Sequence, residues 1–166
     1  MKIPSGVSVQ VEAGKVTVKG PKAELSKKFN PKIVSVAVEG DEVKVSPVVK
    51  KTRKVTAAVN AVEAHVRNMI KGCTEEYSKK LQVVYAHFPI TIEVKGSQVN
   101  IKNFLGEKVP RTAKIVGDTK VSVAGQEITV SGHDKEAVGQ TASNLVRATR
   151  IAKKDVRIFQ DGIYYS

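Results

Sequence analysis

Residues 7–19 read VSVQVEAGKVTVK, and residues 90–102 read ITIEVKGSQVNIK. In each stretch, apolar and polar residues alternate on both sides of a glycine, Gly14 or Gly96. Alternation with a period of two around a glycine is typical of a β-hairpin with one buried face. The second stretch begins 83 residues after the first, at 90 rather than 7, so the sequence predicts the same hairpin twice.

Each half of the chain continues with further strand patterns and closes with a helical one. The expected strands are 33–39 and 42–46 in the first half, and 112–116, 120–123 and 126–130 in the second. Apolar residues spaced by three and four then run from Val55 to Ile70, with Gly72 at the expected helix end. A second such run extends from Val138 to Val146, with Asp134 at the expected N-cap.

The order of these elements is the same in both halves. We therefore predict an α+β fold of two tandem copies of a similar module, each an antiparallel β-sheet packed with one amphipathic α-helix. The modules are assigned to residues 1–80 and 81–166, are joined near 73–84, and the second carries a C-terminal basic and aromatic tail. The alternative is a chance resemblance between two generic α+β halves.

The 166 residues include 28 Lys and Arg against 16 Asp and Glu, a formal net charge of +12. This excess favours a polyanionic partner, above all nucleic acid, over a mixed-charge surface that serves solubility alone. Neither a membrane-spanning run nor the apolar run of a secretory signal is visible, and Cys73 cannot form an internal disulfide. We expect an intracellular, cytoplasmic protein that binds no membrane.

The sequence contains no recognisable catalytic, nucleotide or metal motif. His65, His87 and His133 are scattered, and the run from Ser131 to Asp134 is better explained as a helix cap than as a triad. A basic turn from Lys19 to Lys22 either contacts an RNA backbone or is simply solvated. We therefore expect no enzyme activity, no cofactor, no metal and no small-molecule substrate.

Basic and aromatic residues gather at the end of the second helix and in the tail. Arg147, Arg150 and Lys154 would line one helical face if the helix continued that far. Arginine and aromatic planes stack on unpaired bases and lysines neutralise phosphates, although the aromatic residues could equally pack on the sheet. The candidate RNA-binding residues of this region are Arg147, Arg150, Lys153, Lys154, Arg157, Tyr164 and Tyr165.

Five separated motifs resemble the large-subunit ribosomal protein six family over nearly the whole chain. They are residues 18–26 (VKGPKAELS), 84–90 (VYAHFPI), 103–108 (NFLGEK), 134–140 (DKEAVGQ) and 161–164 (DGIY). Three of them, 84–90, 103–108 and 161–164, are similar to the archaeal and eukaryotic branch. The end of the chain soon after Tyr165 favours the archaeal type. The tail differs from the Pro-Glu-Pro-Tyr ending of bacterial members, so their tail contacts cannot be transferred residue by residue.

The resemblance implies two tandem α+β modules in a non-enzymatic, structural protein of the large ribosomal subunit. It implies binding to the last domain of the large-subunit rRNA near the sarcin-ricin loop, mainly through the second module. It further implies a place at the base of the acidic stalk, beside neighbouring ribosomal proteins and close to translational GTPases. Carried onto this chain, it adds Gly132 and Lys135 to the RNA-binding candidates. A free-standing nucleic-acid-binding regulator and an enzyme acting on a polyanion are the alternatives.

Overall fold

The computed structural model describes residues 1–12, 14–40, 42–152 and 154–166 and divides the chain into two compact units. We call Met1–Glu76 the first module and Tyr77–Ser166 the second module. The division falls four residues before residue 80, the boundary drawn from the sequence, because residues 77–80 begin strand β6 (Tyr77–Val84). The expected connection at 73–84 is therefore the end of one helix followed by a strand that pairs within the second module.

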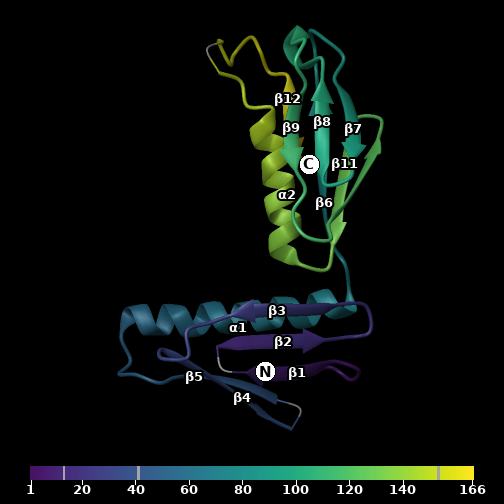
Figure 1. Cartoon of the computed structure of the whole chain (residues 1–166). Helices are drawn as coiled ribbons and strands as arrows, with labels where there is room; N and C mark the ends of the chain where they lie inside the picture. Colours follow the sequence, from purple (N-terminus) through teal and green to yellow (C-terminus); the bar gives the residue numbers. More distant parts are fainter. Residues whose placement is uncertain (13, 41, 153) are drawn as a thin grey trace. The chain divides into compact units, whose positions relative to one another are not determined.

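The first module packs one long helix against two small antiparallel sheets (Figure 1). Its strands and helix are β1 (Ser8–Glu12), β2 (Lys15–Lys19), β3 (Glu24–Lys28), β4 (Val34–Glu39), β5 (Glu42–Pro47) and α1 (Arg53–Thr74). Strands β1, β2 and β3 form one sheet in that order, and β4 pairs with β5 in a separate hairpin. The core lies between α1 and these strands and contains Val16, Val18, Val43, Val66, Met69, Ile70 and Cys73.

Helix α1 begins at a side-chain cap and ends beyond the predicted glycine. The Thr52 Oγ1 atom accepts a hydrogen bond from the Val55 backbone N–H at 3.3 Å, which satisfies one free donor of the first turn. The helix continues through Gly72 to Thr74, so the predicted end at Gly72 is wrong. Gly72 is buried in the helix, and packing of this end against the sheet outweighs the low helix propensity of glycine.

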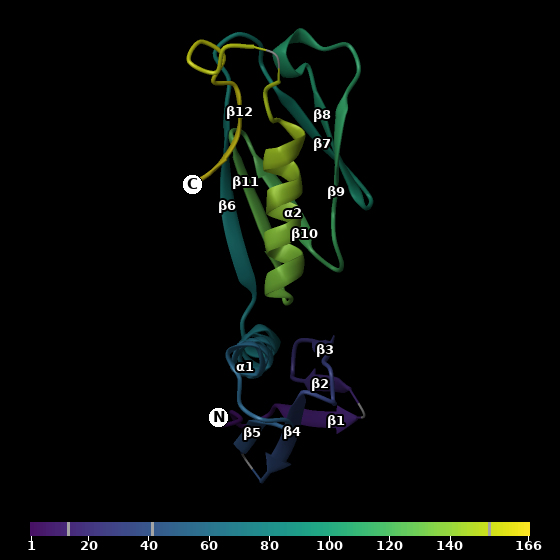
Figure 2. The same ribbon diagram turned by 90° about the vertical axis from the view of Figure 1, so that its left-hand side faces the viewer.

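The second module places one shorter helix against two sheets that share a single core (Figure 2). Its elements are β6 (Tyr77–Val84), β7 (Thr91–Lys95), β8 (Gln98–Lys102), the 3₁₀ turn η1 (Phe104–Gly106), β9 (Arg111–Lys114), β10 (Lys120–Ala124), β11 (Glu127–Gly132), α2 (Lys135–Ala148) and β12 (Gly162–Tyr165). One sheet has the order β10-β11-β6-β12 and the other β7-β8-β9. Helix α2 contacts β9 of one sheet and β6, β11 and β12 of the other.

The tandem α+β architecture is confirmed, with one correction to the sheets. Within the described residues, the strands of each module form two sheets rather than one. Alternation of apolar residues marks a strand but does not specify its partner, which is decided by packing of the whole module. The predicted N-cap of α2 is also confirmed, since the Asp134 carboxylate accepts a hydrogen bond from the Glu136 backbone N–H at 2.9 Å.

Candidate RNA-binding surface

A groove of about 350 Å³ lies in the second module where α2 ends and the tail returns as β12. Its lining comes from the helix end, the segment after it and the tail, and comprises Val146, Arg147, Thr149, Arg150, Ile151, Val156, Phe159, Gly162, Ile163 and Tyr164. The groove therefore brings together Arg147, Arg150 and Tyr164, three of the residues expected to bind RNA. Its floor is apolar, and both of its arginines are exposed.

Helix α2 ends at Ala148, six residues before Lys154, the last residue of the expected basic helical face. The predicted helical face of Arg147, Arg150 and Lys154 is therefore wrong, because Arg150 and Lys154 lie in the segment after the helix. The Thr149 hydroxyl donates to the Val146 carbonyl at 3.2 Å and accepts from the Ile163 backbone N–H at 3.0 Å. These bonds join the helix end to β12 and fix one wall of the groove.

Arg111 on β9 holds the end of α2 from the opposite side. Its guanidinium donates to the carbonyls of Ala148 at 3.0 Å and Arg150 at 3.1 Å. It also donates to both carboxylate oxygens of Glu107, at 2.8 and 2.6 Å, and lies 4.3 Å from the centre of the Phe104 ring. These hydrogen bonds hold the pKa of Glu107 below its ordinary value. The last carbonyls of the helix, which carry its negative partial charge, are thus paired with a cation.

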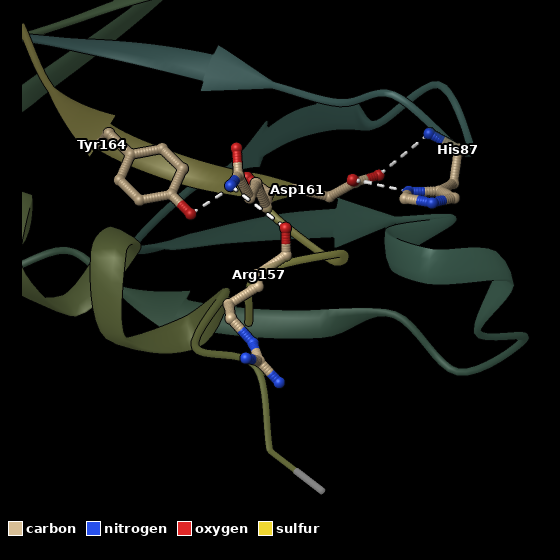
Figure 3. A network of polar contacts seen from close by, with 5 residues as sticks. His87, Arg157, Asp161 and Tyr164 are labelled. Carbon is tan, nitrogen blue, oxygen red and sulfur yellow. Dashed lines mark hydrogen bonds and ion pairs between the residues drawn. The ribbon is translucent and has the colours of Figure 1, made fainter. Parts of the chain in front are cut away.

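A buried carboxylate fastens the tail to the loop between β6 and β7 (Figure 3). Asp161 is 1% exposed and accepts hydrogen bonds from the His87 ring Nδ1 at 2.9 Å and the His87 backbone N–H at 3.2 Å. Burial by itself would raise the pKa of the Asp161 carboxyl. The hydrogen bonds from His87 and the Ala86 backbone outweigh that effect and hold the pKa below its ordinary value. The tail is therefore anchored at the position from which β12 begins.

The aromatic residue Phe159 is engaged inside the module. Its ring is stacked on the His87 ring with centroids 4.9 Å apart, and the Lys154 ammonium lies 4.5 Å from its centre. Arg157 makes a bidentate, solvent-exposed pair with Asp155 at 2.9 and 3.1 Å. In Figure 3 the Arg157 guanidinium points away from Asp161. Lys154 and Arg157 therefore lie beside the groove without lining it, and Lys153 falls outside the described residues.

The two tail tyrosines point to different places. The Tyr164 hydroxyl donates to the Gln160 carbonyl at 3.0 Å, and its ring covers Gly162, where a Cβ would lie 3.2 Å from the ring. The Tyr165 hydroxyl lies 3.0 Å from the Ser143 Oγ on α2, and the Lys79 ammonium lies 5.1 Å from the Tyr165 ring centre. Both rings remain about half exposed, but only Tyr164 lines the groove.

Gly132 and Lys135 lie at the other end of α2. Twelve residues separate Lys135 from Arg147, which corresponds to about 18 Å along a helix. Gly132 is buried, and a Cβ there would lie 3.1 Å from Val138 Cγ2, so close packing accounts for this glycine. Lys135 is exposed with its ammonium 5.9 Å from the centre of the Tyr77 ring. The candidate residues thus form two separate groups on the second module.

The basic turn of the first module is explained by packing. A Cβ at Gly20 would lie 2.5 Å from Cys73 Cβ, so only glycine lets this turn meet the end of α1. Lys19 pairs with Glu24 at 3.3 Å. Cys73 is fully buried, and burial raises the pKa of its thiol, which makes it unreactive. An RNA contact at Lys22 stays an untested alternative.

Within the described ranges, no group of three or more His, Cys, Asp or Glu side chains could hold a metal ion. None of the described helices is long and apolar enough to span a membrane. The run from Ser131 to Asp134 crosses from β11 to α2, with Asp134 acting as the helix cap.

Comparison with known proteins identifies the family. The family described as ribosomal protein L6 matches residues 3–76 and 88–162. This chain belongs to the ribosomal protein L6 family. It is 46% identical to the large ribosomal subunit protein uL6 of Methanothrix thermoacetophila over 99% of this chain and 93% of that protein. It is 47% identical to the uL6 of Methanosarcina mazei, over 99% of this chain and 93% of that protein. It is 44% identical to the uL6 of Ignicoccus hospitalis, over 98% of this chain and 89% of that protein.

The predicted resemblance and its archaeal type are therefore confirmed, and the two matched stretches agree with the tandem repeat. The family is that of a structural, non-enzymatic ribosomal protein, as the sequence predicts. Arg111, which fixes the end of α2, is not among the residues predicted from the sequence. The only signal in the sequence is its spacing of four from Glu107, since its contacts to Ala148 and Arg150 link distant segments.

Proposed function

We propose that this chain is a structural component of the large ribosomal subunit in the cytoplasm and that it binds large-subunit rRNA through its second module. The observation that carries the proposal is the groove at the end of α2, where Arg147 and Arg150 border an apolar floor. Lys154 and Arg157 extend this basic edge, and Lys153 adds a charge in the sequence. The matched relatives, each a large ribosomal subunit protein uL6, support the assignment to that subunit.

Binding follows from charge and shape together. Arginine and lysine side chains at the helix end bind phosphate oxygens and release counterions, which gives affinity without sequence specificity. A helix C-terminus normally repels anions, but here Arg111 occupies the carbonyls of Ala148 and Arg150. The anchored tail holds the basic residues beside the groove in one conformation. Little conformational entropy is therefore lost when a folded RNA of complementary shape binds. Lys135 would make a separate contact at the other end of α2.

The finer location rests on the family resemblance. On that basis we propose that the chain binds the last domain of the large-subunit rRNA, near the sarcin-ricin loop and at the base of the acidic stalk. Neighbouring large-subunit proteins would then be direct partners, and translational GTPases would bind close by. The proposal involves no cofactor, no membrane and no small-molecule substrate.

The first experiment is sedimentation of source-cell lysate through a sucrose cushion at high salt, followed by detection of the chain. An integral protein held by shape as well as charge should remain with the large subunit. A binder held by 6–10 phosphate contacts alone should lose roughly 10³–10⁵ in affinity between 50 and 200 mM salt. Release into the supernatant would favour a free-standing RNA-binding regulator.

A second experiment tests the residues. We expect Arg150→Ala, Lys153→Ala and Lys154→Ala each to weaken binding to protein-free large-subunit rRNA and to reduce the salt slope by roughly 0.7–0.9. Lys95→Ala is the matched control, because Lys95 ends β7 far from the loop that contacts the tail. An unchanged slope in all three variants would place the RNA surface elsewhere on the chain.

A further inference from the structure

The groove at the end of α2 is more than a basic patch, because its floor is apolar and concave. Ile151, Val156 and Ile163 contribute aliphatic side chains, and Tyr164 contributes an aromatic ring. Val156 is 64% exposed, which is unusual for an aliphatic residue unless a partner covers it or it stands alone. Here it does not stand alone, since it forms part of a continuous lining. A ligand for this groove therefore needs a flat or compact apolar part.

The rim of the same groove carries two arginines and therefore favours a negatively charged ligand. Arg147 and Arg150 are both exposed, and neither forms an ion pair with another of the described residues. Guanidinium groups match phosphate oxygens in a bidentate manner. The carbonyls that would repel a phosphate at this helix end already accept hydrogen bonds from Arg111. The ligand thus combines an apolar part with an adjacent negative charge.

We propose that this groove binds one unpaired RNA nucleotide, with its base against Ile151, Val156 and Tyr164 and its phosphate at Arg147 and Arg150. A nucleotide carries a flat base beside a phosphate, which is the combination that the floor and the rim require. A volume of about 350 Å³ lies at the small end of ligand sites and suits one such unit rather than a helical stem. This inference rests on the proposed function, since it adds a specific subsite to general phosphate contacts.

A paired base cannot be the occupant. In an A-form stem the face of each base is covered by its stacked neighbours, and the major groove is too deep and narrow for side chains to reach. Proteins that read RNA specifically instead take bases from loops and bulges and stack them on aromatic rings or guanidinium planes. The groove therefore selects a bulged or looped nucleotide.

The site is built before any ligand arrives. The Tyr164 ring is held by its hydroxyl bond to Gln160 and lies over Gly162. The bond between Thr149 and Ile163 joins the end of α2 to β12. Asp161 anchors the chain immediately before β12 through His87. A preformed groove loses little conformational entropy on binding, which suits the permanent capture of a single nucleotide.

The test uses the full chain, protein-free large-subunit rRNA from the source cells, and two matched variants. Val156→Asp puts a charge into the groove, whereas Ile158→Asp puts the same charge on a neighbouring residue that is 65% exposed and does not line it. We expect Val156→Asp to weaken binding about 5- to 100-fold, the range for loss of one stacked base, and Ile158→Asp to weaken it much less.

The nucleotide itself is identified by chemical probing of the bound rRNA. Dimethyl sulfate and a carbodiimide together report the base-pairing edges of all four bases. We expect one unpaired nucleotide to become protected by the wild-type chain and by Ile158→Asp, and to become reactive again with Val156→Asp. Circular dichroism checks that each variant is folded, and Val156→Ser with Ile158→Ser repeats the comparison without a charge.

Three results separate the hypotheses. Equal losses for the two aspartate variants, with salt-dependent binding retained, would overturn the groove inference and leave the proposed function intact. No binding of the wild-type chain to rRNA would overturn both. Unchanged rRNA binding by Val156→Asp, combined with loss of a neighbouring protein from assembled subunits, would show that a protein segment fills the groove and would overturn the inference.

Discussion

The first and second modules carry the same charge and the same kind of fold, yet they place their cations differently. Each contains 14 basic and 8 acidic residues, a net charge of +6. Helix α1 begins with Arg53 and Lys54 and has no acidic residue in its first turn, whereas α2 has Asp134 as its cap and Glu136 in its first turn. Net charge therefore does not distinguish the modules, but the position of charge relative to each helix does.

The modules also differ in how they use buried polar groups. The buried polar side chains of the described residues are Thr119, Thr141, Thr149 and Asp161, all in the second module. Three of them, Thr141, Thr149 and Asp161, connect α2 or the tail to a neighbouring segment. The first module instead relies on close apolar packing, as at Gly20 and Cys73. A duplicated module can thus keep its fold while only one copy acquires a rigid polar framework around a groove.

The largest expected effect on stability is at Arg111 in the second module. Arg111→Ala should lower the free energy of unfolding by about 2–3 kcal/mol, because it leaves Glu107 and the carbonyls of Ala148 and Arg150 without their cation. Arg67→Ala in the first module removes an exposed pair with Glu63, four residues away, and should cost about 0.5 kcal/mol or less. Urea unfolding with module-resolved hydrogen exchange measures both. Equal losses would contradict the role of Arg111 as a helix anchor.

Two glycines, one in each module, should respond to alanine with opposite signs. Gly20→Ala should destabilise the first module by about 1–3 kcal/mol, because the new Cβ would overlap Cys73. Gly139→Ala in α2 meets nothing within 4 Å and should stabilise the second module by about 0.5–1 kcal/mol through helix propensity. Thermal unfolding of both variants tests the pair. Stabilisation by Gly20→Ala would mean that the turn and α1 are not in close contact.

Acid should weaken the second module through Asp161. Its pKa is lowered in the folded chain, so its stabilisation is complete above the unfolded value of about 3.9 and is lost as the pH falls through the folded value. Asp161→Asn should cost about 1–2 kcal/mol at pH 7 and should remove this acid-dependent part. Asp155→Asn, which breaks only the exposed pair with Arg157, is the control and should have a smaller effect. Hydrogen exchange from pH 7 to pH 3 resolves the two modules.

Local sequence patterns predict some parts of the two modules and not others. Strands with several alternating apolar residues and both helices were visible, since each carries a strong period. Strands β3, β6 and β12 are not predicted. Leu25 is the only apolar residue of β3, β12 has only four residues, and β6 begins with a polar run, residues 78–80, inside the expected connection at 73–84. Arg147, Arg150 and Tyr164 were expected from local composition, and the structure brings them to one groove. Their support by Arg111, Thr149 and Asp161 depends on contacts between distant segments, which no local pattern encodes.

The smallest expected change in stability comes from reversing a charge at the start of α1. Lys54→Glu should stabilise the first module by about 0.5–1 kcal/mol, because a carboxylate in the first turn interacts favourably with the positive end of the helix dipole. Lys71→Glu, in the last turn of the same helix, changes the charge equally and should destabilise it. Both effects should shrink in 1 M salt, where the screening length falls to about 3 Å.

Since the groove lies on the second module, Lys54→Glu should also weaken rRNA binding less than Lys154→Glu does. A larger loss at Lys54 would shift the main RNA contact to the first module and reverse the comparison.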